Sequence, residues 1–260
     1  MPLLEVQGVT LTFRGLAALL NVGFSVEKGQ VASLIGPNGA GKTSMLNCIS
    51  GRYHPDEGRI TLDDRDLLSM AAHDRVKAGL SRTFQNIALF KGLSVLDNLM
   101  VGRHVRLDYG LLSSLCYWGK ARRKEDLHRR RIEEIIDFLG LSPYRHQVAG
   151  KLPYGVQKRV ELGRALAGEP ELLLLDEPMA GMNLEETEDM ARYILDINEE
   201  WGITILLVEH DMGVVMDISD HVVVLDFGQI LAAGTPAQIQ SDPDVIAAYL
   251  GSDNAAFTGR

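Results

Sequence analysis

Short apolar runs, separated by helix-like and turn-like segments, dominate the chain. Residues 3–13 alternate between apolar and polar positions as a half-buried strand does, and a second strand is predicted near residues 20–26. Uninterrupted apolar runs at residues 31–35, 172–175 and 203–208 are typical of parallel strands that are covered on both faces. Buried strands that alternate with helices predict an α/β domain.

Helical spacing and capping residues mark the segments between these strands. Ser94 is the predicted N-cap of a helix that runs to about Gly102. Apolar residues at helical spacing over 132–139 indicate a core-packed helix that ends at Gly140. A further helix is predicted over 152–166, with a proline in its first turn. Smaller elements are predicted at residues 58–63 (strand), 74–79 (helix), 80–85 (strand) and 221–226 (strand).

Residues 103–131 differ in character from the rest of the chain. They combine apolar and aromatic residues with a basic run that ends at Arg131. Opposite charges lie four residues apart in two pairs, Glu125 with Arg129 and Asp126 with Arg130. This spacing favours a solvated helix that is stabilised by ion pairs between successive turns. The aromatic and basic residues beside that helix leave open a contact with lipid headgroups or a membrane protein.

The most specific motif is G-x-x-x-x-G-K-T, between the apolar run 31–35 and a helix-like segment. Its glycines let the backbone wrap a polyphosphate, with N–H groups and a helix N-terminus facing the negative charge. Lys42 is placed to reach the β- and γ-phosphates, and the Thr43 hydroxyl to ligate Mg²⁺. An ordinary glycine-rich turn would explain neither side chain. The predicted phosphate-binding residues are Gly36, Pro37, Asn38, Gly39, Ala40, Gly41, Lys42 and Thr43.

Ionisable residues follow two of the buried strands. Asp176 and Glu177 end the leucine run, and His210 follows the run 203–208. Ligands of open α/β sheets bind at the carboxyl ends of the strands. We expect Asp176 to hold Mg²⁺ and Glu177 to orient or deprotonate the attacking water. A lone histidine at a strand end is more often structural, but after these motifs His210 is expected to hydrogen-bond the γ-phosphate.

Two further positions depend on their context. Phe13 is placed either to stack on an adenine ring, which contributes about 1–3 kcal/mol, or to face the interior of its sheet. The residues favour neither alternative. Gln85 ends a brief predicted strand and precedes an apolar, turn-rich stretch at 87–93 that has the character of a partner-facing surface.

Composition narrows the class of protein. The 260 residues are 46% apolar, which is ample for the core of one large α/β domain. The net charge of -9 argues against a nucleic-acid partner, which selects for a basic face. Only two cysteines occur, which fits a reducing compartment. The sequence carries no leader-like N-terminus and no apolar stretch of bilayer length, so we expect a protein that is soluble by itself. If it works at a membrane, another protein must hold it there.

In order along nearly the whole chain, these motifs resemble those of ABC transporter ATP-binding subunits. Residues 36–43 are similar to the Walker A motif, Gln85 to the Q-loop, 152–157 to the signature, 172–177 to Walker B, and His210 to the H-loop. The resemblance implies ATP and Mg²⁺ as ligands, with Gln85 as a catalytic residue and, beside Thr43 and Asp176, a third ligand of Mg²⁺. It implies a P-loop NTPase of ABC type with a mixed sheet core, an antiparallel β subdomain and a helical signature subdomain. It also implies a head-to-tail dimer whose nucleotides lie between one subunit's P-loop and the other's signature helix.

The signature departs from the family pattern L-S-G-G-Q, because residues 152–156 read L-P-Y-G-V and lack the serine. A charge-assisted hydrogen bond contributes about 1.5–3 kcal/mol, so this loss would weaken ATP-driven closure about tenfold or more. Tyr154 and Gly155 are still expected at the nucleotide, where the Gly155 N–H and the helix N-terminus face its charge. We expect the site to work, since Lys42 and both acids are present.

Tyr154, the segment 180–183 and the extra residues 103–131 look like the Liv type, the ATP-binding subunits of branched-chain amino acid importers. That resemblance implies integral-membrane permease subunits, a second ABC ATPase subunit or a second copy of this chain, and indirectly a periplasmic or lipid-anchored binding protein. It places the protein peripherally on the cytoplasmic face of the inner membrane. The predicted domain is residues 1–251, with a helical subdomain at about 86–165 and a polar tail at 252–260.

Two alternatives come from other classes. An ATPase of a lipid or lipopolysaccharide exporter shares the motifs, but the insertion at 103–131 counts against it. A soluble ABC ATPase that acts on ribosomes or DNA typically has two such domains or a long coiled coil, and the acidic charge also disfavours it. The sequence of this chain does not identify the transported substrate.

Overall fold

The computed structural model of the protein describes residues 2–106 and 120–250. The chain divides into two compact units, Met1–Arg82 with Glu171–Arg260, and Thr83–Pro170. The polar tail predicted at 252–260 and residues 107–119 of the predicted insertion lie outside the described residues. The side chains of Glu125 and Asp126, for which ion pairs were predicted, also lie outside them.

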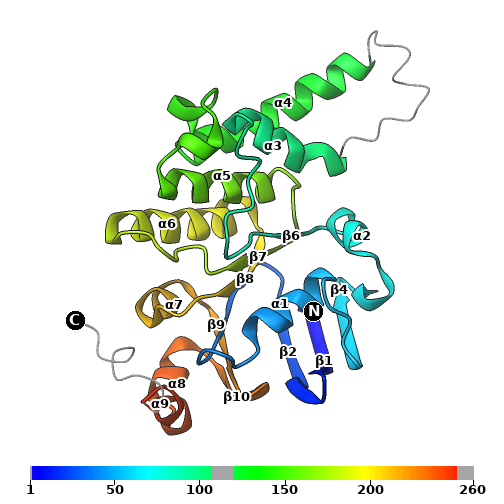
Figure 1. The fold of residues 1–260 in the computed structure, drawn as a ribbon, viewed down its shortest axis with the longest axis vertical. Coiled ribbons are helices and arrows are strands. Elements are labelled where there is room, and N and C mark those ends of the chain that lie inside the picture. Colours follow the sequence, from blue (N-terminus) through cyan, green and yellow to red (C-terminus); the bar gives the residue numbers. More distant parts are fainter. Residues whose placement is uncertain (1, 107–119, 251–260) are drawn as a thin grey trace. The chain divides into compact units, whose positions relative to one another are not determined.

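In the first unit, the N-terminal strands form a four-stranded antiparallel sheet in the order β2-β1-β4-β5 (Figure 1). Five apolar residues of β1 are buried, because one face of this sheet packs on the core: Leu3, Leu4, Val6, Val9 and Leu11. The strands are β1 (Pro2–Phe13), β2 (Leu16–Glu27), β4 (Glu57–Leu62) and β5 (Arg65–Asp66).

A six-stranded sheet in the order β10-β9-β3-β8-β7-β6 forms the centre of the same unit. Four of its five strand pairings are parallel, and β10 runs antiparallel to β9 at the edge. Every residue of β3, β7 and β8 is buried, as their apolar runs predict. The strands are β3 (Val31–Ile35), β6 (Leu80–Arg82), β7 (Leu172–Asp176), β8 (Thr204–Val208), β9 (His221–Asp226) and β10 (Gln229–Gly234). The predicted mixed sheet with a separate antiparallel sheet is thus confirmed.

Helices connect the strands of the first unit. Helix α6 begins with a capping box in which Asn183 and Glu186 exchange side-chain to backbone hydrogen bonds. No helix within residues 2–106 and 120–250 is long and apolar enough to cross a membrane. The helices are α1 (Lys42–Ser50), η1 (Leu67–Ser69), α2 (Ala72–Lys77), α6 (Leu184–Trp201), α7 (Met212–Ile218), α8 (Pro236–Ser241) and α9 (Pro243–Leu250).

Two small elements differ from their predicted bounds. The strand predicted at 80–85 ends at Arg82, because only Leu80–Arg82 pair with β7 before the chain enters the second unit. Gln85 therefore lies beyond the strand. The helix predicted at 74–79 spans Ala72–Lys77 instead, since Gly79 has φ 100°, which no helical residue adopts.

The second unit is helical in its described part. Ser94 caps α3 by accepting a hydrogen bond from the Asp97 N–H, as predicted. Helix α5 begins one residue after Pro153, which is its N-cap rather than part of its first turn. Gly163 of α5 lies against Leu139, whose side chain would be 3.0 Å from an added Cβ. The elements are α3 (Val95–Arg103), η2 (His104–Arg106), α4 (Lys120–Phe138), η3 (Ser142–Tyr144), η4 (Ala149–Lys151) and α5 (Tyr154–Leu166).

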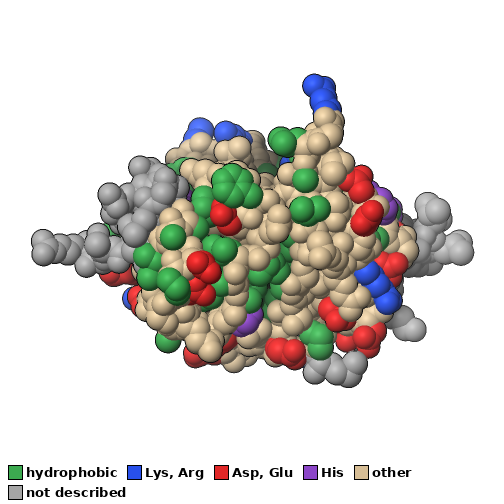
Figure 2. Space-filling model, turned by 90° about the horizontal axis from the view of Figure 1, so that it is seen from below, with side chains coloured by type: hydrophobic (Ala, Val, Ile, Leu, Met, Phe, Trp, Pro, Cys, Tyr) green, Lys and Arg blue, Asp and Glu red, His purple; other side chains and the backbone are tan. Residues whose placement is uncertain are grey.

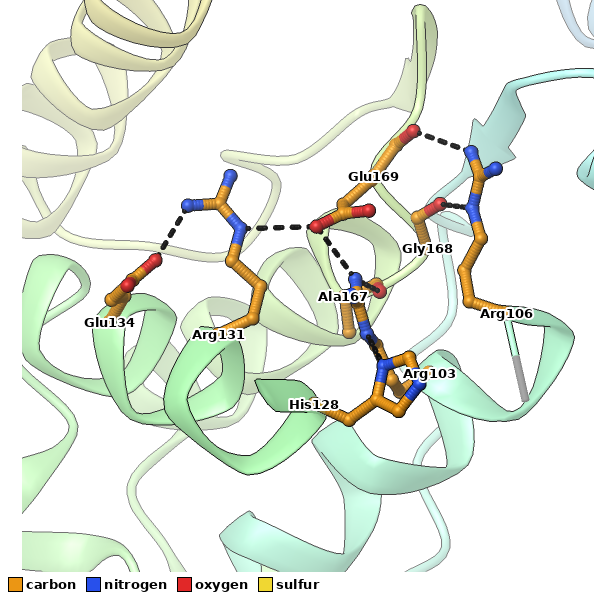
Figure 3. Close-up of polar contacts among 8 residues, drawn as sticks. All are labelled: Arg103, Arg106, His128, Arg131, Glu134, Ala167, Gly168 and Glu169. Carbon is orange, nitrogen blue, oxygen red and sulfur yellow. Dashed lines mark hydrogen bonds and ion pairs between the residues drawn. The ribbon is translucent and has the colours of Figure 1, made fainter. Parts of the chain in front are cut away.

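Arg103, at the end of α3, contacts both α4 and the segment that follows α5 (Figure 3). Its guanidinium is buried and donates to the Ala167 carbonyl oxygen at 3.1 Å, just beyond α5. It also forms an ion pair with Glu169 at 2.9 Å and donates from Nε to Nδ1 of His128 on α4 at 2.9 Å. One buried cation therefore satisfies the end of α5 and links it to α3 and α4.

Two neighbouring arginines extend this group of contacts. Arg106 of η2 donates to the carbonyl oxygens of Gly168 and Glu169, both at 2.9 Å. Arg131 of α4 lies 3.5 Å from the Glu169 carboxylate and pairs with Glu134 at 2.8 Å. These carbonyl groups follow directly on α5, whose C-terminus carries the negative end of the helix dipole, so nearby cations are stabilising (Figure 3).

Replacement of Arg103 by methionine should destabilise the second unit. The substitution removes a charged donor from the Ala167 carbonyl and the Glu169 carboxylate, so we expect the free energy of unfolding to fall by about 1.5–3 kcal/mol. Urea unfolding followed by circular dichroism measures the change. Arg129→Met, at an exposed position of α4, is the matched control and should change stability by less than about 0.5 kcal/mol. Equal midpoints for the two variants would contradict the role given to Arg103.

Candidate nucleotide-binding site

The glycine-rich loop between β3 and α1 has a backbone that only glycine fits. Gly36, Gly39 and Gly41 have φ values of 151°, 84° and 106°. A Cβ on Gly36 would lie 2.0 Å from the Leu225 carbonyl oxygen, and one on Gly41 would lie 2.6 Å from the Ala18 carbonyl oxygen. The loop is therefore enclosed by neighbouring backbone, and α1 begins directly behind it at Lys42. This is a cradle that fits phosphate groups.

Lys42 brings the loop and the acidic residues into one electrostatic site. Its Nζ donates to the carbonyl oxygens of Gly36 at 2.6 Å and Pro37 at 3.0 Å, and the side chain is buried. Burial lowers the pKa of Lys42, while the negative charges of Glu177 and Asp176 raise it. Both acids thus lie within electrostatic reach of the lysine, as a phosphoryl-transfer site requires.

Asp176, at the carboxyl end of β7, is held by Arg82, a residue that the sequence did not single out. The two side chains are almost fully buried, and Arg82 Nη2 lies 2.8 Å from Asp176 Oδ2. Arg82 Nη1 also donates to Asn47 Oδ1 at 2.8 Å and Ser50 Oγ at 2.7 Å on α1. The arginine therefore connects β6, β7 and the helix that follows the loop.

The residues predicted to hold Mg²⁺ have suitable donor atoms. The exposed hydroxyl of Thr43 in the first turn of α1 and the carboxylate of Asp176 are the oxygen ligands that this ion prefers. Within the described residues, no group of three His, Cys, Asp or Glu side chains could hold a metal by itself. The pair of Thr43 and Asp176 therefore fits a Mg²⁺ ion whose other ligands are phosphate oxygens and water molecules. The third predicted ligand, Gln85, belongs to the second unit.

Glu177 follows Asp176 in an unusual backbone conformation. Its φ is 49°, a region that non-glycine residues rarely adopt, and its N–H donates to the Val208 carbonyl oxygen at 2.8 Å. Strained residues of this kind persist where the surroundings fix them, and they cluster at functional sites. His210 follows the neighbouring strand β8, and its side chain is 62% exposed. Since Asp176 is paired with Val208, the two chain segments end at the same edge of the sheet.

Glu209 is a second buried acid that the sequence analysis did not assign. It is 1% exposed, and its carboxylate accepts hydrogen bonds from the N–H of Met179 at 2.9 Å and of His210 at 3.2 Å. Burial raises the pKa of Glu209, an effect that these two hydrogen bonds oppose and the charge of Glu177 reinforces. The Glu209 carboxylate thus connects the segment that follows β7, through the Met179 N–H, to the segment that follows β8, through the His210 N–H. The only sign of Glu209 in the sequence was its position directly after the apolar run 203–208.

Phe13, at the end of β1, is 44% exposed, so the alternative of an inward-facing strand residue is wrong. Its ring lies edge-on to Tyr53, with 5.2 Å between the ring centroids and 73° between the planes. Tyr53 comes shortly after α1 and was not predicted. One face of an aromatic ring that is held at its edge can stack on a nucleobase.

The other predicted site residues lie in the second unit. The Gln85 carbonyl oxygen accepts a hydrogen bond from Lys158 Nζ at 3.3 Å. Tyr154, the first residue of α5, is 43% exposed, and Lys158 Nζ lies 5.9 Å from its ring centroid. Gly155 is buried in the same first turn. Contacts of Gln85, Tyr154 and Gly155 with a nucleotide stay predictions from the resemblance.

Comparison with known proteins gives consistent relatives along the whole chain. The family model described as ABC transporter matches residues 19–180, and one described as branched-chain amino acid ATP-binding cassette transporter matches residues 229–255. The chain is 44% identical to the high-affinity branched-chain amino acid transport ATP-binding protein BraF of Pseudomonas aeruginosa, over 96% of this chain and 98% of that protein. It is 42% identical to LivG of Escherichia coli K12, with the same coverage.

Solved structures give the same result. A nucleotide-free ATP-binding cassette from an ABC transporter superposes with a TM-score of 0.83 at 34% identity, covering 96% of this chain and 99% of that one. The cbiO1 protein of Clostridium perfringens superposes with a TM-score of 0.80 at 25% identity, covering 95% and 93%.

The raised pKa of Glu209 predicts a pH dependence of stability. Because the folded protein binds this proton more tightly than the unfolded chain, stability falls as the pH rises from the ordinary glutamate value through the folded-state pKa, and is highest below both. Glu209→Gln removes this contribution, so its free energy of unfolding should improve relative to wild type as the pH rises from acidic to neutral.

Urea unfolding at several pH values measures that difference. Exposed Glu185→Gln, on α6, controls for the loss of a carboxylate. A difference between Glu209→Gln and wild type that stays constant with pH would show that Glu209 is as readily ionised in the folded protein as in the unfolded chain.

Proposed function

Since the chain belongs to the ABC transporter family of ATP-binding proteins, we propose that it hydrolyses ATP to power the import of branched-chain amino acids through a membrane permease. The observation that carries this proposal is the 44% identity to a branched-chain amino acid transport ATP-binding protein over 96% of the chain. The match of residues 229–255 to a branched-chain transporter model supports it independently of the nucleotide-binding motifs. The relatives give no support to the alternative of a lipid exporter.

ATP binds with its phosphates in the glycine-rich loop. The backbone N–H groups of the loop and the N-terminus of α1 face the phosphate oxygens, and Lys42 exchanges its bonds to the loop carbonyls for the β- and γ-phosphates. Phe13 stacks on the adenine. Thr43 and Asp176 would hold Mg²⁺, which would supply positive charge to balance the charge of the phosphates.

Hydrolysis then needs a water in line with the γ-phosphate. Glu177 accepts its proton or orients it, because the carboxylate follows Asp176 and lies within electrostatic reach of Lys42. His210 donates a hydrogen bond to the γ-phosphate. Glu209 fixes the backbone of both turns through the N–H groups of Met179 and His210.

We further propose that the protein acts as a dimer, with itself or with a second ABC ATPase, beneath integral-membrane permease subunits. A periplasmic or lipid-anchored protein supplies the substrate. At the N-terminus of α5, where Gly155 lies, backbone N–H groups take the place of the missing signature serine in facing the nucleotide of the other subunit. On the face drawn in Figure 2, acidic side chains are spread widely and Lys and Arg occur at few places, which supports partners other than nucleic acid.

The assembly is tested by purifying the tagged protein from native membranes in mild detergent and identifying the co-purifying proteins. We expect two permease subunits, a second ATPase and a binding protein. The purified binding protein should bind leucine, isoleucine or valine in calorimetry. Co-purification of lipid-export components, or of no membrane protein, would overturn the importer assignment.

Replacement of the proposed base, Glu177→Gln, should trap ATP. General-base catalysis contributes about 10²–10⁴-fold, so we expect hydrolysis to fall at least about 100-fold while ATP binding persists. With ATP and Mg²⁺ the variant should elute as a dimer in size exclusion. Exposed Glu185→Gln is the matched control and should hydrolyse ATP normally, and Lys42→Ala should bind no nucleotide. A Glu177→Gln protein that hydrolyses ATP at the wild-type rate would exclude this base.

A further inference from the structure

Helix α1 is followed by a short segment that returns to the strand that carries Phe13. Gly51, with φ 83°, ends the helix in the left-handed conformation. The N–H groups of Arg52 and Tyr53 then donate to the Asn47 carbonyl oxygen at 2.9 Å and 3.0 Å. These bonds fold the chain back on the last turn of α1. The position of Tyr53 is therefore fixed relative to the helix that begins at the glycine-rich loop.

The same segment also binds the end of β1. Asp56 Oδ2 accepts hydrogen bonds from the Thr12 N–H at 2.7 Å and from the Thr12 hydroxyl at 2.9 Å. The Asp56 N–H donates to the Thr10 carbonyl oxygen at 2.8 Å. Three hydrogen bonds of one residue thus hold the end of the strand, and a carboxylate acceptor makes the stronger kind of hydrogen bond. Phe13 is the next residue along the chain and the last of β1.

Tyr53 adds a contact through its ring. The centroids of the Tyr53 and Phe13 rings lie 5.2 Å apart and the planes meet at 73°, which is the edge-to-face geometry that aromatic pairs prefer. Tyr53 is half-buried and packs against the hydrophobic core of the first unit, whereas Phe13 is 44% exposed. The half-buried ring therefore acts as a support, and the contact restricts the orientation of the more exposed ring.

The orientation of Phe13 determines how well it can receive a base. The side chain turns about two bonds, and an exposed side chain without a neighbour samples several rotamers. Only the fraction of molecules with the ring in the stacking orientation binds the base, and the apparent affinity is weakened by that fraction. A flat ring has two faces, so the contact with Tyr53 takes up at most one of them and leaves the other for the base.

The geometry points to Tyr53 as a positioning residue that holds Phe13 in the orientation in which it stacks on the base of the nucleotide. The inference rests on the proposed function, which supplies the nucleotide and its stacking on Phe13. It gives α1 a second role, because the phosphate-binding loop precedes this helix and the support of the stacking ring follows it. In this role Tyr53 acts through Phe13.

Tyr53→Leu removes the aromatic ring, and Tyr53→Phe keeps it. In Tyr53→Leu we expect the Kd of ATP with Mg²⁺ and the KM for ATP to rise about 2- to 10-fold, the effect of one lost aromatic pair, with kcat unchanged. Inorganic tripolyphosphate, which has no base, should keep its wild-type Kd in calorimetry. Tyr53→Phe should match wild type for both ligands. Leu68→Ala is the matched control, since Leu68 packs against the same core, and it should lower Tm without changing either Kd.

A double variant shows whether Tyr53 acts through Phe13. Phe13→Ala alone should raise the Kd of ATP about 5-fold or more, because it removes the stacking ring. Once that ring is absent, Tyr53→Leu should cause no further rise, since residues that act through one contact are not additive.

The order of the Phe13 ring is measured without nucleotide. With ¹³C-labelled phenylalanine, the NMR order parameter of this ring should be lower in Tyr53→Leu than in wild type or Tyr53→Phe. A wild-type order parameter in Tyr53→Leu would overturn the positioning role. So would a rise in Kd that is equal for ATP and tripolyphosphate, or one that adds to the effect of Phe13→Ala. A wild-type protein that binds no ATP would instead overturn the proposed function, and the order parameter would still decide whether Tyr53 positions Phe13.

Discussion

The close approach of backbone to backbone at the glycine-rich loop is the constraint on which the first unit depends. Gly36 lies against the Leu225 carbonyl and Gly41 against the Ala18 carbonyl, at distances that exclude any side chain. These contacts join β3, β9 and β2 around a loop that has few apolar atoms of its own. They also determine where α1 begins, and hence where Lys42 lies. The chemistry follows from this position, because the lysine is then buried within reach of two acids.

The carboxylates at this site need partners that offset their mutual repulsion. Asp176, Glu177 and Glu209 place three carboxyl groups near the ends of two adjacent strands, a repulsive arrangement unless each has a partner. Asp176 has the Arg82 guanidinium, and Glu209 has two backbone N–H groups. A buried ion pair of this kind stabilises little in net terms, but removing one partner leaves a costly charge. The pair is therefore better understood as fixing the orientation of Asp176 than as a source of stability.

The sequence predicted what depends on local pattern. Apolar runs revealed the buried strands, and the order of glycines and the lysine revealed the loop, because these signals lie within a few neighbouring residues. Contacts between distant segments left no such signal. Arg82 meets Asp176 from 94 residues away, and Glu209 meets Met179 from 30. For the same reason the sequence could not decide whether Phe13 faces inward, since that depends on Tyr53 and the sheet register.

Arg82 also marks the point where the chain passes from one unit to the other. The chain leaves the first unit after Arg82 and returns at Glu171, and the strands on either side of this excursion, β6 and β7, are adjacent parallel partners. Arg82 is the last residue of β6, and Asp176 the last of β7. The ion pair between them therefore joins the carboxyl ends of these two neighbouring strands. Asp176 is thus held by a residue of its own sheet, at the position where the chain leaves that sheet.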